Sequence, residues 1–524
     1  MVAEIAPCST KGFEFGADAR VGVVGAGAMG SGIAQVAALA GHKVALQDTR
    51  SGAATAAVDS ISTQIRRLAE KGKLESSVGE DAIANLQAVE SLDGLSGSAL
   101  VIEAIVENLE AKQSLFLALE SILDKNAILA TNTSSIPVTA IGAPLAHPER
   151  LAGLHFFNPA PRMPLVEVIR GAHTAREVVD LLYVTAKRWG KVPVHARATP
   201  GFIVNRVARP FYAEGLRLLD EGAADCATID ALMREAGGFR MGPFELMDLI
   251  GHDVNYAVTR TVFESYYGDQ RFMPSLRQLE LVEAGFLGRK SGRGFYRYID
   301  YAGPPEPRTA EPRKAPLWPT VYRGGGLGEL LAQRLEAAGH DVDLASAHAD
   351  GRIADGKDFI LYRTDGRTAT QRATRNGFSG TLLVDLTLDD SKAKRLALAA
   401  ADQAGKESVD AAIGLLQAAG YAVSLIDDVP GMAVARTVAM LANEAADAVN
   451  QGVCNARDVD LAMRNGVNYP RGPLEWATSL GIGRIVSILD NLATIYGEDR
   501  YRTSSLLRRK AWAGTDFSTG KGSA

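Results

Sequence analysis

The sequence contains little cysteine and no large excess of either charge. Its 524 residues include 3 cysteines, and Cys8, Cys226 and Cys454 lie too far apart to form a CxxC metal-binding pattern or a disulfide framework. Lys and Arg number 56 against 61 Asp and Glu, which gives a net charge of −5. Because basic residues do not outnumber acidic ones, we expect no nucleic-acid partner. We also expect no metal site.

Long apolar runs are also missing. No stretch approaches the roughly 18 residues that span a bilayer, and the first 20 residues contain no apolar segment typical of a signal peptide. We therefore expect a cytoplasmic protein with no membrane partner. The 47% of hydrophobic and 22% of charged residues are typical of globular proteins. The length suits about three or four domains.

A glycine-rich pattern opens the ordered part of the sequence. The apolar run 21–24 predicts a buried strand, and residues 25–30 follow it as GAGAMG, which fits the GxGxxG pattern. Gly25 permits a tight turn, Gly27 lets the backbone approach a pyrophosphate, and Gly30 lets the helix pack on the strand. The helix that begins near Ala28 and Met29 offers free N–H groups to that diphosphate. The pattern predicts a dinucleotide-binding site.

An acidic residue sets the expected choice of dinucleotide. A second strand over 44–46 leads to Asp48, which is placed to bind the ribose hydroxyls and to repel a 2′-phosphate. The positive charge of Arg50 weakens this preference for NAD over NADP but does not reverse it. The sequence therefore predicts NAD rather than NADP as the cofactor.

Two further strands carry a histidine and a glutamate. The runs 151–159 and 164–169 are joined by a proline-bearing loop, which favours their lying side by side. Glu167 stands among apolar residues and needs a partner if it is buried, and His155 on the neighbouring strand is the natural one. A histidine held by a carboxylate suits a general base acting on an alcohol. From spacing alone, a core histidine and a catalytic dyad both remain open.

Seven motifs stand in one order along the first half of the chain: GAGAMG, AIVEN (104–108), NTSS (132–135), GLHFFNP (153–159), LVEVI (165–169), TPGFIVNR (199–206) and MGPFEL (241–246). In this set the sequence resembles the 3-hydroxyacyl-CoA dehydrogenase family over residues 20–298. The resemblance implies a Rossmann-type α/β NAD-binding domain followed by an all-α domain, an acyl-CoA substrate and an active site between the two domains.

The resemblance also implies roles for individual residues. His155 would be the catalytic base and Glu167 its partner, and Ser134 and Asn205 would bind the substrate oxygen. The residues expected to line the NAD site, besides the glycine loop, are Asp48, Glu107, Lys112 and Asn132. Lys71 lies near the position where the family contacts CoA, within a basic run formed by Arg66, Arg67, Lys71 and Lys73. That run fits a CoA phosphate site and a solvated helix face equally well.

The second half repeats the helical part of the first. At an offset of 230 the match has no gap, and it joins Pro200-Gly201 to Pro430-Gly431 and Gly242-Pro243 to Gly472-Pro473. Six prolines between 304 and 319 indicate a semi-rigid linker. We expect the two helical copies to pack on each other, as subunits of single-copy relatives do. Association of whole chains into a homodimer is left open.

A weaker repeat of the nucleotide-binding part precedes the second helical copy. At an offset of 298, Gly25 is replaced by Arg323 and Asp48 by Ser346, and at an offset of 230 Ala435 replaces Asn205. We find no equivalent of GLHFFNP or LVEVI here, and we expect this half to bind no cofactor. The expected domains are a leader at 1–20, the Rossmann domain at 21–193, a helical domain at 194–298, a linker at 299–319, a degenerate Rossmann-like domain at 320–424 and the second helical domain at 425–524.

The leading hypothesis is reversible oxidation of an (S)-3-hydroxyacyl-CoA to a 3-oxoacyl-CoA with NAD. The two-copy arrangement resembles bacterial members of the family that are associated with phenylacetate degradation, whose substrate is 3-hydroxyadipyl-CoA. 3-Hydroxybutyryl-CoA is the alternative substrate. Two other classes remain: a dehydrogenase of free 3-hydroxy acids, which typically uses a lysine base, and a non-catalytic NAD-binding regulator. Arg162, Arg206 and Arg240 are candidates to hold the far carboxylate of a dicarboxylic substrate.

Overall fold

The computed structural model describes residues 15–16, 19–299, 305–348 and 350–517. The predicted leader lies almost wholly outside them, as does Cys8. The chain divides into two compact units. Of the described residues, one unit comprises those up to Arg206 together with Gln451–Val467, and the other comprises those of Val207–Asn450 together with 468–517. Within the described part of the chain, no helix is long and apolar enough to cross a membrane.

The first unit is built on an eight-stranded sheet in the order β3-β2-β1-β4-β5-β6-β7-β8. The strands are β1 (Val21–Val24), β2 (Val44–Gln47), β3 (Leu86–Val89), β4 (Leu100–Glu103), β5 (Ile128–Thr131), β6 (Leu151–Phe156), β7 (Leu165–Arg170) and β8 (Val192–Arg197). The helices are α1 (Ala28–Leu39), α2 (Ala53–Glu70), α3 (Ser76–Ala84), α4 (Leu109–Ile122), α5 (Val138–Gly142), α6 (Arg176–Arg188), α7 (Val204–Val207) and, from the second helical copy, α17 (Ala456–Gly466).

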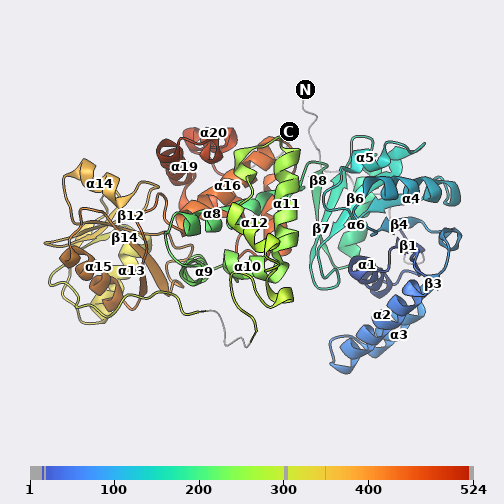
Figure 1. The fold of residues 1–524 in the computed structure, drawn as a ribbon, viewed down its shortest axis with the longest axis horizontal. Coiled ribbons are helices and arrows are strands. Elements are labelled where there is room, and N and C mark those ends of the chain that lie inside the picture. The colour runs from blue at the N-terminus through green and yellow to red at the C-terminus, as the bar shows by residue number, and fades with distance from the viewer. Residues whose placement is uncertain (1–14, 17–18, 300–304, 349, 518–524) are drawn as a thin grey trace. The chain divides into compact units, whose positions relative to one another are not determined.

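All neighbouring strands of this sheet are parallel except β6 and β7, which are antiparallel. Apolar side chains of α1, α2 and α6 pack with the strands into one core, to which Ile33, Ile61 and Leu182 belong. The helices α2 and α3 pack on each other and project beyond the sheet (Figure 1). This arrangement is the Rossmann-type domain that the glycine pattern predicts.

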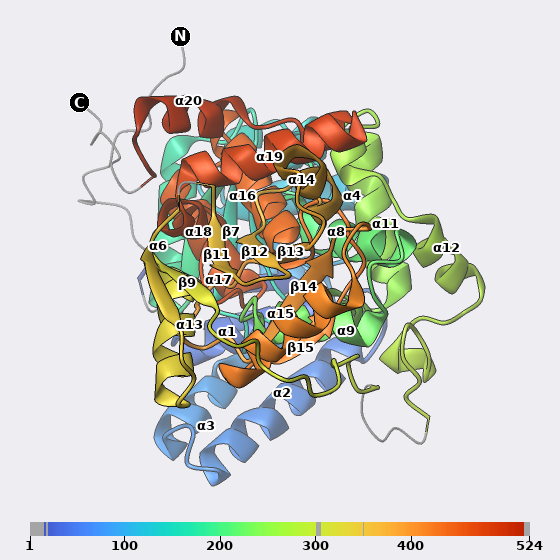
Figure 2. The same ribbon diagram turned by 90° about the vertical axis from the view of Figure 1, so that its left-hand side faces the viewer.

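The second unit contains both helical copies, except for the segment that packs in the first unit. Its helices are α8 (Arg209–Asp220), α9 (Cys226–Glu235), α10 (Pro243–Ile250), α11 (His252–Ser265), α12 (Leu276–Glu283), α16 (Val434–Asn450), α18 (Pro473–Leu480), α19 (Ile482–Tyr496) and α20 (Ser505–Ala513). The equivalent helices α8 and α16 pack on each other, so the copies meet within the chain. In both views α16, α19 and α20 lie together (Figure 2).

A buried charge cluster joins the two copies. The Arg436 guanidinium is fully buried and donates to Glu214 at 2.6 Å and to both carboxylate oxygens of Glu221. Tyr501 donates its hydroxyl proton to the same Glu214 oxygen at 3.0 Å. These carboxylates hold the pKa of Arg436 above its ordinary value against the opposing effect of burial. The cluster gives the packing of the copies a specific register.

The second unit also holds a seven-stranded sheet in the order β10-β9-β11-β12-β13-β14-β15. Its strands are β9 (Thr320–Arg323), β10 (Asp343–Ser346), β11 (Arg352–Asp355), β12 (Ile360–Arg363), β13 (Thr381–Val384), β14 (Arg395–Ala400) and β15 (Ala422–Leu425), and its helices are α13 (Gly326–Ala337), α14 (Ala369–Asn376) and α15 (Lys406–Ala418). Strand β11 is antiparallel to both neighbours, unlike β4 in the first sheet. The described linker residues bind this sheet: Ala310 N donates to the Val423 carbonyl oxygen at 2.7 Å.

Candidate active site

The glycine loop has the shape that a dinucleotide requires. Gly25 has a φ of +103°, and a Cβ there would meet the Ala104 carbonyl oxygen at 2.5 Å. A Cβ on Gly30 would lie 1.7 Å from the Gly25 oxygen, so both positions demand glycine. A Cβ on Gly27 would meet nothing within 4 Å. Gly27 is the N-cap of α1 and borders open space, and its lack of a side chain leaves that space free for a diphosphate. These residues fit NAD.

Asp48 follows β2 and faces the same loop. Its Oδ2 accepts a hydrogen bond from Ala26 N at 2.7 Å, and its Oδ1 accepts from the Arg50 backbone N at 2.9 Å. The Arg50 side chain also binds the carboxylate, with Nε 3.0 Å from Oδ1. This contact is the main reason that the pKa of Asp48 lies well below its ordinary value. Asp48 is therefore a carboxylate at any physiological pH, beside the glycine turn.

A buried network organises the loop after β5. Glu107 Oε1 accepts from the Thr133 hydroxyl at 2.6 Å and from the backbone N of Ser134 at 3.1 Å. Burial alone would raise the pKa of Glu107, but the hydroxyl groups of Thr133 and Ser135 and the Lys112 charge lower it below its ordinary value. Lys112 is only 1% exposed and donates to Glu103 at 2.6 Å, while it lies 3.2 Å from Glu107. Lys112 thus lies beneath the loop, where it supports Glu107.

Glu103 also belongs to this network, although the sequence predicted no individual role for it. It ends β4, is fully buried, and accepts from Lys112, from the Thr131 hydroxyl and from Ile105 N. The signal that would have found it is an acid placed at the end of an apolar strand, where an unpaired charge is costly.

The histidine and the glutamate meet as predicted. In the antiparallel pair β6–β7, His155 lies directly opposite Glu167, and His155 Nδ1 is 2.7 Å from Glu167 Oε2. The other carboxylate oxygen accepts from the backbone N of Ile203 and of Val204, each at 3.0 Å. The His155 ring packs on Phe157, with centroids 4.6 Å apart. Because Glu167 takes Nδ1, the Nε2 atom is the one left to exchange a proton.

The remaining predicted residues occupy different surroundings. Ser134 is half-buried on the loop between β5 and α5, and Asn205 is half-buried on α7, next to the turn that binds Glu167. Asn132 accepts from Phe156 N at 2.8 Å and so ties the end of β5 to the end of β6. Lys71 is exposed at the end of α2.

The second half does contain an equivalent of the histidine-bearing strand pair, contrary to the prediction. The ungapped offset of 230 extends back to β13 and β14, where Val384 lies opposite Leu398 as Leu154 lies opposite Val168. The prediction failed because only the backbone pairing is kept, while the motif residues are replaced.

The replacements remove the dyad. Asp385 stands at the position of His155, and Ala397 stands at that of Glu167. Asp385 accepts directly from the backbone N–H groups of 433–435, of which 433 and 434 are the counterparts of the two that bind Glu167. Burial raises the pKa of Asp385 to about 6, although these hydrogen bonds oppose the rise. The second sheet therefore keeps a carboxylate that binds the backbone at the start of α16, but it has no histidine at the position of His155.

The glycine turn of the second half is also changed, in a different way from the one predicted. Two residues, Gly324 and Gly325, separate β9 from α13, whereas three separate β1 from α1. Arg323 is therefore not in the turn. It ends β9 and pairs with Glu329 at 2.5 Å. The shorter turn removes the position that Gly25 fills.

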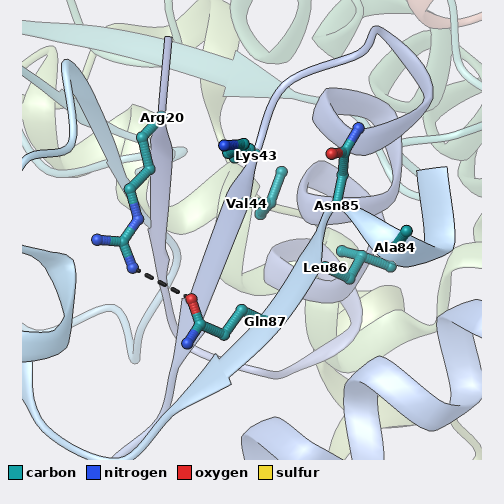
Figure 3. A pocket seen from close by; sticks show the side chains of 7 residues that line it. All are labelled: Arg20, Lys43, Val44, Ala84, Asn85, Leu86 and Gln87. Carbon is teal, nitrogen blue, oxygen red and sulfur yellow. Dashed lines mark hydrogen bonds between the residues drawn. The ribbon is translucent and has the colours of Figure 1, made fainter. Parts of the chain in front are cut away.

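A cavity of about 660 Å³ opens at the amino ends of β1, β2 and β3. Arg20 donates to Gln87 across it at 3.4 Å (Figure 3). The other residues that line it are Lys43, Val44, Ala84, Asn85 and Leu86. Ligands of parallel sheets bind at the opposite, carboxyl ends of the strands, so this cavity lies apart from the site described above.

Comparison with protein-family models covers most of the chain. Residues 20–199 match the model of the 3-hydroxyacyl-CoA dehydrogenase NAD binding domain, and residues 201–298 and 431–523 each match the C-terminal domain of that enzyme. Residues 361–430 match a domain described as the reduced Rossmann-fold domain of 3-hydroxybutyryl-CoA dehydrogenase.

Individual proteins agree with these models. The chain is 44% identical to the 3-hydroxyadipyl-CoA dehydrogenase of Escherichia coli over 94% of this chain and 97% of that protein. A probable 3-hydroxybutyryl-CoA dehydrogenase of Deinococcus radiodurans is 40% identical and aligns over its full length to 53% of this chain. The crystal structure of an E. coli 3-hydroxybutyryl-CoA dehydrogenase superposes with a TM-score of 0.86 at 43% identity, covering 95% of this chain and 98% of that one. The chain belongs to the 3-hydroxyacyl-CoA dehydrogenase family.

Proposed function

We propose that the chain catalyses the reversible, NAD-dependent oxidation of an (S)-3-hydroxyacyl-CoA to a 3-oxoacyl-CoA at one active site, in its first half. The observation that carries the proposal is the buried contact of 2.7 Å between His155 and Glu167 on adjacent strands. It stands in a domain whose glycine loop fits a dinucleotide.

In the proposed mechanism His155 is the base. Its Nε2 takes the proton of the 3-hydroxyl group as C3 becomes a carbonyl carbon, and it returns a proton in the reverse direction. The glycine loop and Asp48 would hold NAD, which would supply the acceptor for the hydride of C3. Glu167 stabilises the imidazolium that forms and keeps the ring in one orientation, because its second oxygen is fixed by two backbone N–H groups. Phe157 and Phe202 border the ring and shield it from water.

Ser134 and Asn205 are proposed to bind the reacting oxygen or the thioester carbonyl. The support is their sequence position within the NTSS and TPGFIVNR motifs and their partial exposure. Ser134 N donates to Glu107, and Asn205 follows Val204, whose N–H binds Glu167. For Lys71 we propose a contact with a CoA phosphate. Its exposed position at the end of α2 leaves the ammonium group accessible.

The substrate proposed first is 3-hydroxyadipyl-CoA, because the relative of that name matches nearly the whole two-copy chain. A dicarboxylic substrate needs a cation for its far carboxylate. Of the three arginines predicted for this task, Arg206 is only 2% exposed and donates to Gln451 at 2.9 Å, so it is unsuited. Arg162 and Arg240 are exposed, and Arg162, which belongs to the same unit as His155, remains the proposed partner.

We propose the cytoplasm as the place of action. Cys226 and Cys454 are both free thiols in the described structure, which agrees with a reducing compartment.

One assay separates the candidate functions. NADH oxidation, followed by its absorbance, is measured with acetoacetyl-CoA and then with free acetoacetate. Turnover of the thioester alone supports the proposal, turnover of the free acid indicates a 3-hydroxy-acid dehydrogenase, and no turnover with NADH binding retained indicates a regulator. Comparing kcat/KM for 3-hydroxyadipyl-CoA and 3-hydroxybutyryl-CoA then decides between the two acyl chains.

Asp48→Ala is expected to weaken NADH binding by about tenfold or more, the effect of losing a charge-assisted hydrogen bond. It should also narrow the preference for NADH over NADPH, because the carboxylate no longer repels a 2′-phosphate. Fluorescence titration with both cofactors measures the change. Arg50→Ala is the matched control: it removes a partner of Asp48 and leaves the carboxylate, so NADH affinity should persist. Equal use of NADPH and NADH by the unchanged protein would refute the assignment of Asp48.

A further inference from the structure

In each half of the chain, one helix packs on the sheet of the other half. In the first unit Arg197 N, at the end of β8, donates to the Val453 carbonyl oxygen at 2.8 Å. In the second unit the equivalent pair, Asp427 N and the Ala223 oxygen, lies at 3.0 Å. Helix α17 of the second copy accordingly packs on β7 and β8, and helix α9 of the first copy packs on β14.

The packing of α17 places part of the second helical copy against β7, the strand that carries Glu167. Asp458 on α17 accepts from His195 N of β8 at 3.2 Å, and Gln451 accepts from Arg206 at 2.9 Å. Burial first, and then the charges of Asp458 and Glu167, raise the pKa of the Cys454 thiol well above its ordinary value. The segment 451–466 therefore lies close to the carboxylate that supports the base.

Gly466, the last residue of α17, packs tightly against the elements that hold Glu167. A Cβ on Gly466 would lie 2.6 Å from Leu165 Cδ2 and 3.0 Å from Val204 Cγ2. Leu165 is on the catalytic strand two residues before Glu167, and Val204 N donates to the Glu167 carboxylate. Both side chains are at most 2% exposed, and a close-packed interior does not accept an extra methyl group without a shift.

The first copy supplies an internal comparison. At the offset of 230 the counterpart of Gly466 is Ala236, which is 3% exposed and accepts from Leu388 N. The sheet at that place carries Ala397 where Glu167 would be. Alanine is favoured over glycine in a helix by about 1 kcal/mol, and Ala236 occupies the C-cap position directly after α9. Glycine thus stands only in the copy whose helix backs the dyad.

We propose that Gly466 is a positioning residue: by its lack of a side chain it lets Leu165 and Val204 hold the Glu167 carboxylate at its distance from His155. The second helical copy then contributes to catalysis in the first half, beyond its packing role. This inference rests on the proposed function. An added methyl group would displace the strand side chain or the 203–204 turn, and either shift moves the carboxylate relative to the imidazole.

The test is Gly466→Ala in the full-length chain, with Gly483→Ala as the matched control. Gly483 is also helical, but a Cβ there meets nothing within 4 Å. We expect Gly466→Ala to lower kcat for acetoacetyl-CoA by about 10- to 100-fold, the range for a displaced catalytic group. The rate is calculated per NADH-binding site, so that loss of folded protein does not count. NADH affinity and the KM for acetoacetyl-CoA should stay near the unchanged protein's values, as should every parameter of Gly483→Ala.

A compensating variant separates positioning from general damage. Leu165→Val removes the Cδ atoms that the new methyl group would strike, so the double variant Gly466→Ala, Leu165→Val should recover most of the lost kcat. Equal kcat per site in Gly466→Ala and Gly483→Ala overturns the proposal, as does a double variant no faster than the single one. If the unchanged protein fails to oxidise NADH with acetoacetyl-CoA, the proposed function fails, and that result is distinct from either outcome.

Discussion

His155→Gln is expected to lower kcat with acetoacetyl-CoA and NADH by a factor of about 10² to 10⁴, the usual contribution of a general base. The glutamine retains polarity and approximate size but cannot exchange a proton at the position of Nε2. The glycine loop and Asp48 do not contact this side chain, so NADH affinity should remain within about twofold. Stopped-flow measurement of NADH oxidation and a separate NADH titration give both quantities.

His195→Gln is the control for this substitution. His195 belongs to the same sheet and stacks on Tyr183, with centroids 4.5 Å apart, but the proposed chemistry does not use it. Near-normal kcat is expected for it. If His155→Gln retained normal turnover, the base would have to be another group, and the mechanism would fail with it.

Arg436→Met is expected to reduce the free energy of unfolding by about 3 to 5 kcal/mol, the cost of leaving buried carboxylates without their cation. Glu214 is fully buried and loses its 2.6 Å contact, and Glu221 loses a bidentate partner. Methionine fills much of the volume, so the loss reports the charge rather than a cavity. Urea unfolding followed by circular dichroism measures it.

Two further variants test the cause. Arg277→Met breaks the ion pair between Arg277 and Asp220, two side chains that are 48% and 46% exposed. It should reduce the free energy of unfolding by about 1 kcal/mol or less. Adding Glu214→Gln to Arg436→Met should recover part of the loss, because the unpaired buried charge is gone. If Arg436→Met and Arg277→Met reduced the free energy of unfolding equally, the buried charge cluster around Arg436 would not be what holds the two copies together.

The first active site was predictable in large part because its chemistry is local in the sequence. The strand, glycine turn and acid from Val21 to Asp48 follow one another along the chain. The antiparallel pairing of two strands that are neighbours in sequence brings His155 opposite Glu167. Glu103 escaped prediction since its partners, Lys112 and Thr131, come from different elements.

The strand pair β13–β14 of the second half was harder to predict because its residues changed while its backbone pairing did not. Asp385, at the position of His155, binds the N–H groups that are equivalent to those bound by Glu167 in the first half. A comparison of motifs shows only that the histidine and the glutamate are missing. The repeat likewise shows that two copies exist, but it does not tell which helix covers which sheet. The exchange of α9 and α17 follows only from the three-dimensional packing.

The central claim is that one chain of two copies contains one cofactor site. The strand register corrects the predicted counterpart of Asp48 from Ser346 to Ala347, because Ser346 pairs with Arg323 as Gln47 pairs with Val24. The shortened turn at Gly324-Gly325, Ala347 in place of Asp48 and Asp385 in place of His155 all favour the first half as the place of that site. Calorimetric titration of the full-length chain with NADH tests this directly. The account predicts one equivalent of NADH bound per chain, abolished or strongly weakened by Asp48→Ala; two equivalents per chain, or one that Asp48→Ala leaves unaltered, would contradict it.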